Sequence, residues 1–132
     1  MLNINNKEYN VLSSDIKYVN ATYNSRKGYS ILVSLDIELN NEKGYISFYV
    51  DFFDVRDFKN IENKQYVELP TELNSKITMI EIFDTKNFID FIDSEVDLKF
   101  GNINNNQIQM ILKINDELIN LQYEGILNIK LD

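Results

Sequence analysis

The stretch YSILVSLDIELNNEKGYISFYVDFF, Tyr29 to Phe53, decides the fold of this chain because apolar and polar residues alternate through most of it. Successive side chains of a β-strand point to opposite faces of the sheet, so this alternation predicts one face in the core and one in solvent. The interruption NNEKG, Asn40 to Gly44, supplies residues that tolerate the backbone angles of tight turns. The stretch is therefore predicted to be a β-hairpin of an antiparallel sheet.

The same two-residue alternation returns along the rest of the chain. Turn-forming stretches separate short alternating segments at intervals of roughly eight to twelve residues, a spacing typical of β-sandwiches and β-barrels. Further strands are expected over residues 2–4, 9–12, 15–23, 64–69, 76–83, 96–100, 108–114, 119–123 and 127–131. We therefore predict an all-β fold, an antiparallel β-sandwich or partly open β-barrel of about eight to ten strands. One domain is expected to span residues 1–132.

One segment departs from this alternation. The sequence DTKNFIDFIDSE, Asp84 to Glu95, is predicted to contain one short helix near Thr85 to Asp93, begun by an Asp or Thr cap. A strand is the alternative, because the run is short and rich in Phe and Ile. The apolar residues at helical spacing are Phe88, Ile89, Phe91 and Ile92.

The chain is long and apolar enough to bury a core of its own. It has 132 residues, of which 44% are hydrophobic, and a chain of this size buries roughly two thirds of its unfolded surface. The side chains on the inward faces of the predicted strands should form this core. They are Ile31, Val33, Leu35, Ile37, Ile46, Phe48, Val50, Met79, Leu98, Met110, Leu112, Leu121 and Ile129.

The net charge of -8 restricts the partners of the chain. It argues against binding to nucleic acid and to anionic membrane surfaces, because both require Lys and Arg. A partner attracted by this charge would be a basic protein, although the charge could also serve solubility alone. The sequence has no secretory signal pattern and no apolar run long enough to span a membrane, so a cytoplasmic protein is expected.

The chain contains neither histidine nor cysteine. Disulfides, thiolate nucleophiles, histidine general bases, catalytic triads and zinc sites built from these residues are therefore excluded. The glycine-rich motifs that cradle phosphates are also missing. We expect no cofactor and no metal, and enzymatic activity is not favoured.

The densest cluster of polar groups that could carry chemistry is YVDFFDVRDF, with Asp51, Asp54 and Asp57 three residues apart. Three residues of extended strand span roughly 10 Å and reverse the face, so these carboxylates would not converge within a strand. We interpret Asp51 as part of the polar face of the strand and the other two as part of the turn that ends it. The alternatives are a calcium site or a catalytic carboxylate pair.

A second acidic cluster, DFIDSEVD, contains Asp90 and Asp93 and is interpreted as a solvated helix face that runs into a strand. A further candidate surface consists of Tyr45, Tyr49 and Phe53, which accompany an apolar face on the same strand. These aromatic residues are either covered by another element or exposed for binding, as is common for Tyr at interfaces.

Three functions are compatible with these observations. The first is a non-catalytic protein-interaction module that binds a basic partner, in physical type like the acidic immunity proteins and inhibitors that neutralise toxic enzymes. Its contact residues would be Tyr45, Tyr49, Phe53, Asp51, Asp54, Asp57, Asp90 and Asp93. The second is a β-barrel or sandwich that binds a small ligand or carbohydrate, and the third is a carboxylate-based hydrolase. Exposed strand edges could also pair two copies into a homodimer.

Overall fold

The computed structural model describes residues 1–69, 75–86, 88–90 and 95–131. Its strands form one sheet in the order β5-β8-β9-β10-β1-β2-β3-β4-β6-β7. The elements are β1 (Leu2–Ile4), β2 (Lys7–Tyr23), β3 (Arg26–Leu39), β4 (Glu42–Phe53), the 3₁₀ turn η1 (Phe58–Asn60), β5 (Gln65–Glu68), β6 (Ile77–Phe83), β7 (Phe88–Asp90), β8 (Glu95–Asn104), β9 (Gln107–Asn115) and β10 (Asn120–Lys130). The all-β prediction is confirmed.

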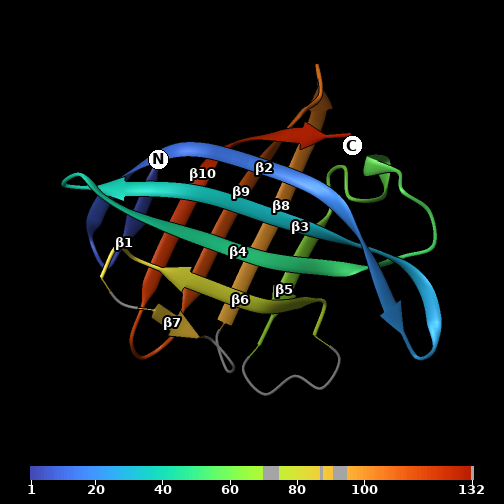
Figure 1. Ribbon diagram of the computed structural model, residues 1–132, viewed down its shortest axis with the longest axis horizontal. Coiled ribbons are helices and arrows are strands. Elements are labelled where there is room, and N and C mark those ends of the chain that lie inside the picture. The colour runs from blue at the N-terminus through green and yellow to red at the C-terminus, as the bar shows by residue number, and fades with distance from the viewer. Residues whose placement is uncertain (70–74, 87, 91–94, 132) are drawn as a thin grey trace.

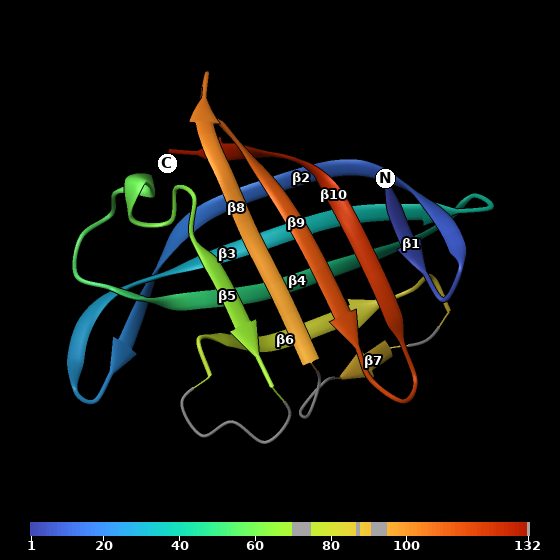
Figure 2. The same cartoon turned by 180° about the vertical axis from the view of Figure 1, so that it is seen from behind.

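The sheet folds over on itself into two layers whose strands cross (Figures 1 and 2). Strands β2, β3, β4, β6 and β7 make one layer, and β1, β5, β8, β9 and β10 make the other. Among the described residues, the two end strands β5 and β7 do not pair with each other, so the sheet is a folded sandwich and not a closed barrel. No α-helix occurs in the described ranges, and thus none there is long and apolar enough to cross a membrane.

The two layers are joined at a corner where β10 changes partner. Its residues 121–123 pair with residues 2–4 of β1, and β1 pairs in turn with the start of β2. Farther along, residues 128–130 of β10 pair directly with residues 15–17 of β2, in parallel. This exchange lets one sheet continue from the first layer into the second.

Asparagine closes the tight hairpins. Each two-residue turn places both residues at positive φ, the conformation of a type I′ turn, which Asn tolerates better than most residues. These turns are Asn5–Asn6, Asn24–Ser25, Asn40–Asn41 and Asn105–Asn106. The predicted hairpin from Tyr29 to Phe53 is confirmed, with a turn shorter than expected because β4 already begins at Glu42. Gly44 lies within β4, where a Cβ atom would collide with the carbonyl oxygen of Phe83.

Almost all of the predicted core is buried between the layers. The exceptions are Met79, which is 69% exposed, and Ile129, which is half-buried against the core. Met79 was misplaced because the register of β4 and β6 shifts beside it, and its φ is 53°. A β-bulge of this kind reverses which side chains face inward.

The helix expected from Thr85 to Asp93 is absent from the described residues. Phe88–Asp90 forms the strand β7 and pairs with β6, while residues 87 and 91–94, including Asp93, lie outside the described residues. The helical spacing of Phe and Ile is too short to outweigh pairing with a neighbouring strand, which these residue types favour. The strand alternative is therefore correct at Phe88–Asp90. Two further segments run unbroken where shorter strands were expected, β2 through a bulge after Val11 and β10 through Gly125.

Candidate functional site

A β-bulge at Asp51 determines how the end of β4 presents its side chains. Asp51 has a φ of 57°, and the register between β3 and β4 shifts at this position. After the bulge, Phe53 packs against the core, with its ring centroid 5.9 Å from that of Tyr18. Tyr49 and Phe52 instead line a hollow on the outer face. The structure thus separates Phe53 from Tyr49, and the expected surface of Tyr45, Tyr49 and Phe53 is not one patch.

This hollow, here called the aromatic groove, has a volume of about 600 Å³. It lies on the outer face of the β2, β3, β4 and β6 layer and is bordered by residues of the β2–β3 hairpin tip and of β6. Figure 1 shows this hairpin tip curving toward the level of β6. Its principal side chains are Tyr23, Arg26, Tyr49, Phe52, Lys76 and Met79.

The rings in the aromatic groove are arranged around Phe52. Tyr23 lies beside it with ring centroids 5.8 Å apart, and the Arg26 guanidinium lies over the Phe52 ring at 5.1 Å from its centroid. Arg26 also forms an ion pair of 3.0 Å with Asp54. Because both of these charged side chains are about two thirds exposed, the pair adds little stability and remains available to a ligand.

Met79 forms part of the groove wall in an unusual conformation. Its φ of 53° lies in the left-handed region, which costs free energy for a residue with a Cβ atom. Its side chain is 69% exposed, so burial in the monomer does not compensate for this cost. Strained residues of this type are concentrated at functional sites.

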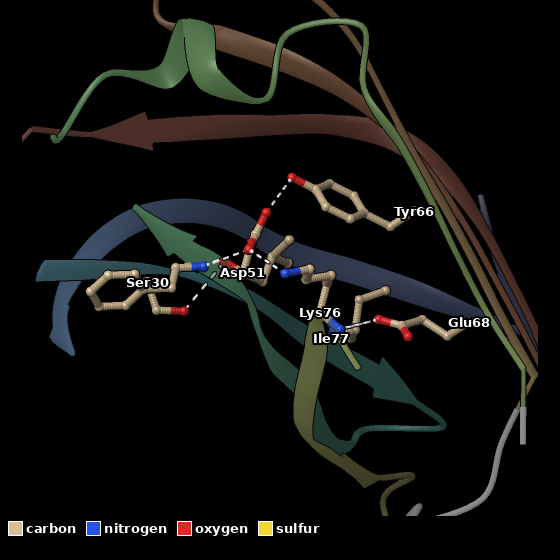
Figure 3. A network of polar contacts seen from close by, with 8 residues as sticks. Ser30, Asp51, Tyr66, Glu68, Lys76 and Ile77 are labelled. Atoms are coloured by element: carbon tan, nitrogen blue, oxygen red, sulfur yellow. Dashed lines mark hydrogen bonds and ion pairs between the residues drawn. The ribbon is translucent and has the colours of Figure 1, made fainter. Parts of the chain in front are cut away.

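Beside the groove, side chains connect the end strand β5 with β4 and with the start of β6. Figure 3 shows the Tyr66 hydroxyl of β5 donating to Asp51 Oδ2 at 3.4 Å, while Lys76 Nζ lies 3.8 Å from Asp51 Oδ1. The Asp51 amide donates to the Lys76 carbonyl oxygen at 2.6 Å. Burial raises the pKa of the Tyr66 hydroxyl, and the negative charge of Asp51 raises it further.

Glu68 adds a second contact of β5, with the start of β6, and we call this contact the Glu68 seam. Its side chain is almost fully buried, and Oε1 accepts hydrogen bonds from the Lys76 amide at 2.5 Å and the Ile77 amide at 2.6 Å (Figure 3). The Glu68 carboxylate thus hydrogen-bonds β5 to the start of β6, in place of the backbone hydrogen bonds that join neighbouring strands elsewhere in the sheet.

The remaining predicted site residues lie apart from one another. Asp54 belongs to the turn after β4, and Asp57 caps η1 by accepting from the Lys59 amide at 3.0 Å. Asp54 and Asp57 thus belong to the turn after the strand, as interpreted from the sequence. The Asp51 side chain is instead only 18% exposed and contacts Tyr66 and Lys76, so it does not lie on a solvated polar face. Asp90 lies in the edge strand β7.

Tyr45 lies near the opposite end of β4 from the bulge. Its ring stacks on Phe83 at a centroid distance of 6.0 Å. The aromatic groove does not include Tyr45 among its lining residues. Of the three aromatic residues proposed from the sequence, the groove therefore retains only Tyr49.

The sequence alone did not indicate the residues that dominate the groove. Met79 was assigned to the core, and Arg26 was not among the candidate site residues. Phe52 was not among them either, because the alternation gives no sign of a bulge. The nearest signal is the Asp at position 51, since Asp tolerates positive φ better than most residues.

The groups of the groove can make apolar, cation–π and hydrogen-bonding contacts. The groove provides aromatic rings, a thioether, two cations and hydroxyl groups, and no three acidic side chains of the described residues gather to hold a metal ion. The chain matches no protein-family model, no curated protein and no solved structure.

Proposed function

We propose that this chain is a non-catalytic protein-binding module whose contact surface is the aromatic groove. The observation that carries the proposal is the gathering of Tyr23, Phe52, Met79 and Arg26 around one hollow of about 600 Å³. Tyr, Phe, Met and Arg are the residue types enriched in the centres of protein–protein interfaces. Tyr and Arg are also frequent among the residues that contribute most of the binding energy.

The exposure of two of these side chains supports the same function. Tyr23 is 55% exposed and Met79 is 69% exposed, although both are large and apolar. Scattered apolar residues on a surface need no explanation, but two that line one hollow provide a contiguous contact area. Met79 keeps this position at the cost of a left-handed backbone, which a purely structural role does not require.

The charge of the chain favours a basic partner. The net charge is -8, and the two cations of the groove are each paired with an aspartate, Arg26 with Asp54 and Lys76 with Asp51. The groove itself is therefore close to neutral, within a protein whose overall field attracts positive charge. We propose that the partner inserts an apolar side chain into the groove and surrounds it with Lys and Arg, as a basic enzyme bound by an immunity-type inhibitor would.

Affinity capture with a matched pair of variants tests this function. The immobilised protein is incubated with lysate of its own organism at low and high salt, beside Tyr23→Ser/Met79→Ser and a control, Lys113→Ser, on the exposed face of β9. We expect a basic protein to be retained at low salt by the wild type and the control, and to be lost with the double variant. Equal retention by all three proteins, or capture that does not depend on salt, would contradict the proposal.

The volume of the groove favours a second candidate, the binding of a small aromatic molecule. About 600 Å³ lies within the range of small-molecule sites, which are lined by apolar and aromatic side chains with a few polar groups. A panel of aromatic fragments, tested by thermal shift, separates this function from protein binding. A fragment that stabilises the wild type but not Tyr23→Ser/Met79→Ser would support it, and a panel without effect on the wild type would argue against it.

A further inference from the structure

A second concave surface lies on the other layer of the sandwich. Two adjoining hollows of about 410 and 270 Å³ occupy the outer side of β8, β9 and β10, and they share Asn102, Gln109 and Ile126. We call this surface the amide groove, after its side chains Asn63, Asn102, Asn104, Gln107 and Gln109. The aromatic groove shares no lining residue with it.

Gly101 gives the amide groove its shape. The register of β8 against β9 shifts between Phe100 and Ile103, so the strand bulges at this point. A Cβ atom on Gly101 would lie 2.9 Å from Oε1 of Gln109 and 3.0 Å from its Cβ. The glycine therefore allows Gln109 to lie across β8, where its amide borders both hollows.

Most polar side chains of this surface are amides, accompanied by one lysine and one glutamate. Asn63 Nδ2 donates to Asn102 Oδ1 at 2.9 Å, which leaves the other N–H of that amide for a ligand. The Gln109 side chain makes no hydrogen bond within the described part of the chain. Lys99 and Glu124, the charged residues of the lining, carry charges that cancel.

From this lining we propose that the amide groove binds a neutral carbohydrate. A primary amide presents a donor and an acceptor in one plane, which matches the adjacent hydroxyl groups of a sugar ring. Ile126 is 49% exposed and offers an apolar contact for the C–H face of the ring. A phosphate or carboxylate ligand would require more cations than Lys99, and nucleic acid is disfavoured by the net charge of -8.

Titration followed by ¹H–¹⁵N NMR tests this site with maltotriose, cellotriose and chitotriose as probes. We expect at least one of them to shift the backbone resonances of residues 101–109 and Ile126. Asn102→Leu/Gln109→Leu should then weaken binding by about tenfold or more, because each of the two amides loses a hydrogen bond to a ligand hydroxyl and each such bond contributes roughly a factor of five. The Tyr23→Ser variant, which alters the other groove, should bind as the wild type does.

A folding control accompanies the double variant, and three outcomes would contradict the proposal. Both replaced amides are exposed, and an unchanged fingerprint spectrum away from residues 101–109 establishes that the double variant is folded. Absence of shifts with all three trisaccharides would overturn the proposal. Shifts centred on the aromatic groove, or equal affinity of the double variant, would overturn it as well.

Discussion

At the scale of single residues, Met79 links the fold to the proposed function. Its backbone is held at a φ of 53° while its side chain stays 69% exposed. Replacement with glycine removes the steric cost of the left-handed conformation and sacrifices little buried surface. We expect Met79→Gly to raise the free energy of unfolding by about 1 kcal/mol, measured by urea denaturation.

Met79→Ala is the matched control for this prediction. Alanine keeps the Cβ atom and hence the strain, so its stability should stay within about 0.5 kcal/mol of the wild type. The stabilised glycine variant should nevertheless lose affinity for a partner held in the aromatic groove. A glycine variant less stable than the alanine variant would show that the conformation of Met79 carries no strain.

Tyr66 makes the stability depend on alkaline pH. Burial raises the pKa of its hydroxyl above the ordinary value of 10.0, and Asp51 raises it further. As the pH rises through 10, tyrosines of the unfolded chain release protons that folded Tyr66 keeps, so the unfolded state gains stability. We expect the ionisation of Tyr66 to leave the urea midpoint unchanged below about pH 9 and to lower it above about pH 10.

Tyr66→Phe identifies the contribution of this one hydroxyl to the alkaline loss. Tyr9, Tyr18 and Tyr123 also have pKa values raised by burial, so part of the loss should persist in the variant. The slope of stability against pH should therefore be smaller than in the wild type but not zero. An unchanged slope would mean that Tyr66 ionises as readily in the folded chain as in the unfolded one.

At the scale of elements, the Glu68 seam predicts a large effect from one side chain. Glu68→Ala leaves the amides of Lys76 and Ile77 without their acceptor at a largely buried site, at a cost of about 2–3 kcal/mol. Glu68→Gln retains an acceptor oxygen and should cost less. Urea denaturation measures both, with Glu117→Ala in an exposed turn as the control. A Glu68→Ala variant as stable as that control would mean that the seam does not hold β5 against β6.

The sequence predicted the strands and their inward-facing residues correctly where the alternation of apolar and polar residues continued through a whole strand. Ile31, Val33 and Leu35 face inward as predicted, because nothing in β3 interrupts the two-residue period over these residues. The bulges at Asp51 and Met79 could not be predicted, since a bulge reverses the facing of later residues without an obvious change in composition. The bulge at Asp51 turns Phe53, which was expected on the same face as Tyr49, toward the core and places Phe52 in the groove.

At the scale of the whole molecule, the topology predicts an unequal distribution of stability. β3 is paired on both sides, with β2 and with β4, whereas β5 pairs only with β8 among the described residues. Hydrogen exchange should therefore be slowest in β3, where opening requires global unfolding, and at least about tenfold faster in β5. Glu68→Ala should accelerate exchange in β5 more than in β3. Equal protection of the two strands would contradict this ranking.

The whole molecule also separates two candidate surfaces onto opposite layers. The aromatic groove lies on the β2, β3, β4 and β6 layer, and the amide groove lies on β8, β9 and β10. Binding at one surface leaves the other accessible, so a protein partner and a carbohydrate could be held at the same time. The sequence suggested both classes of ligand but could not assign either to a surface, because that assignment depends on how the sheet folds over.

Site-specific photo-crosslinking most directly tests whether the aromatic groove is the recognition surface. A benzophenone amino acid is placed at position 23, on the rim of the groove, or at position 113, on the exposed face of the opposite layer. Each protein is then irradiated in lysate of its own organism. We expect a discrete crosslinked partner from position 23 and none from position 113. A partner crosslinked from position 113 alone, or equally from both positions, would show that the aromatic groove is not the recognition surface.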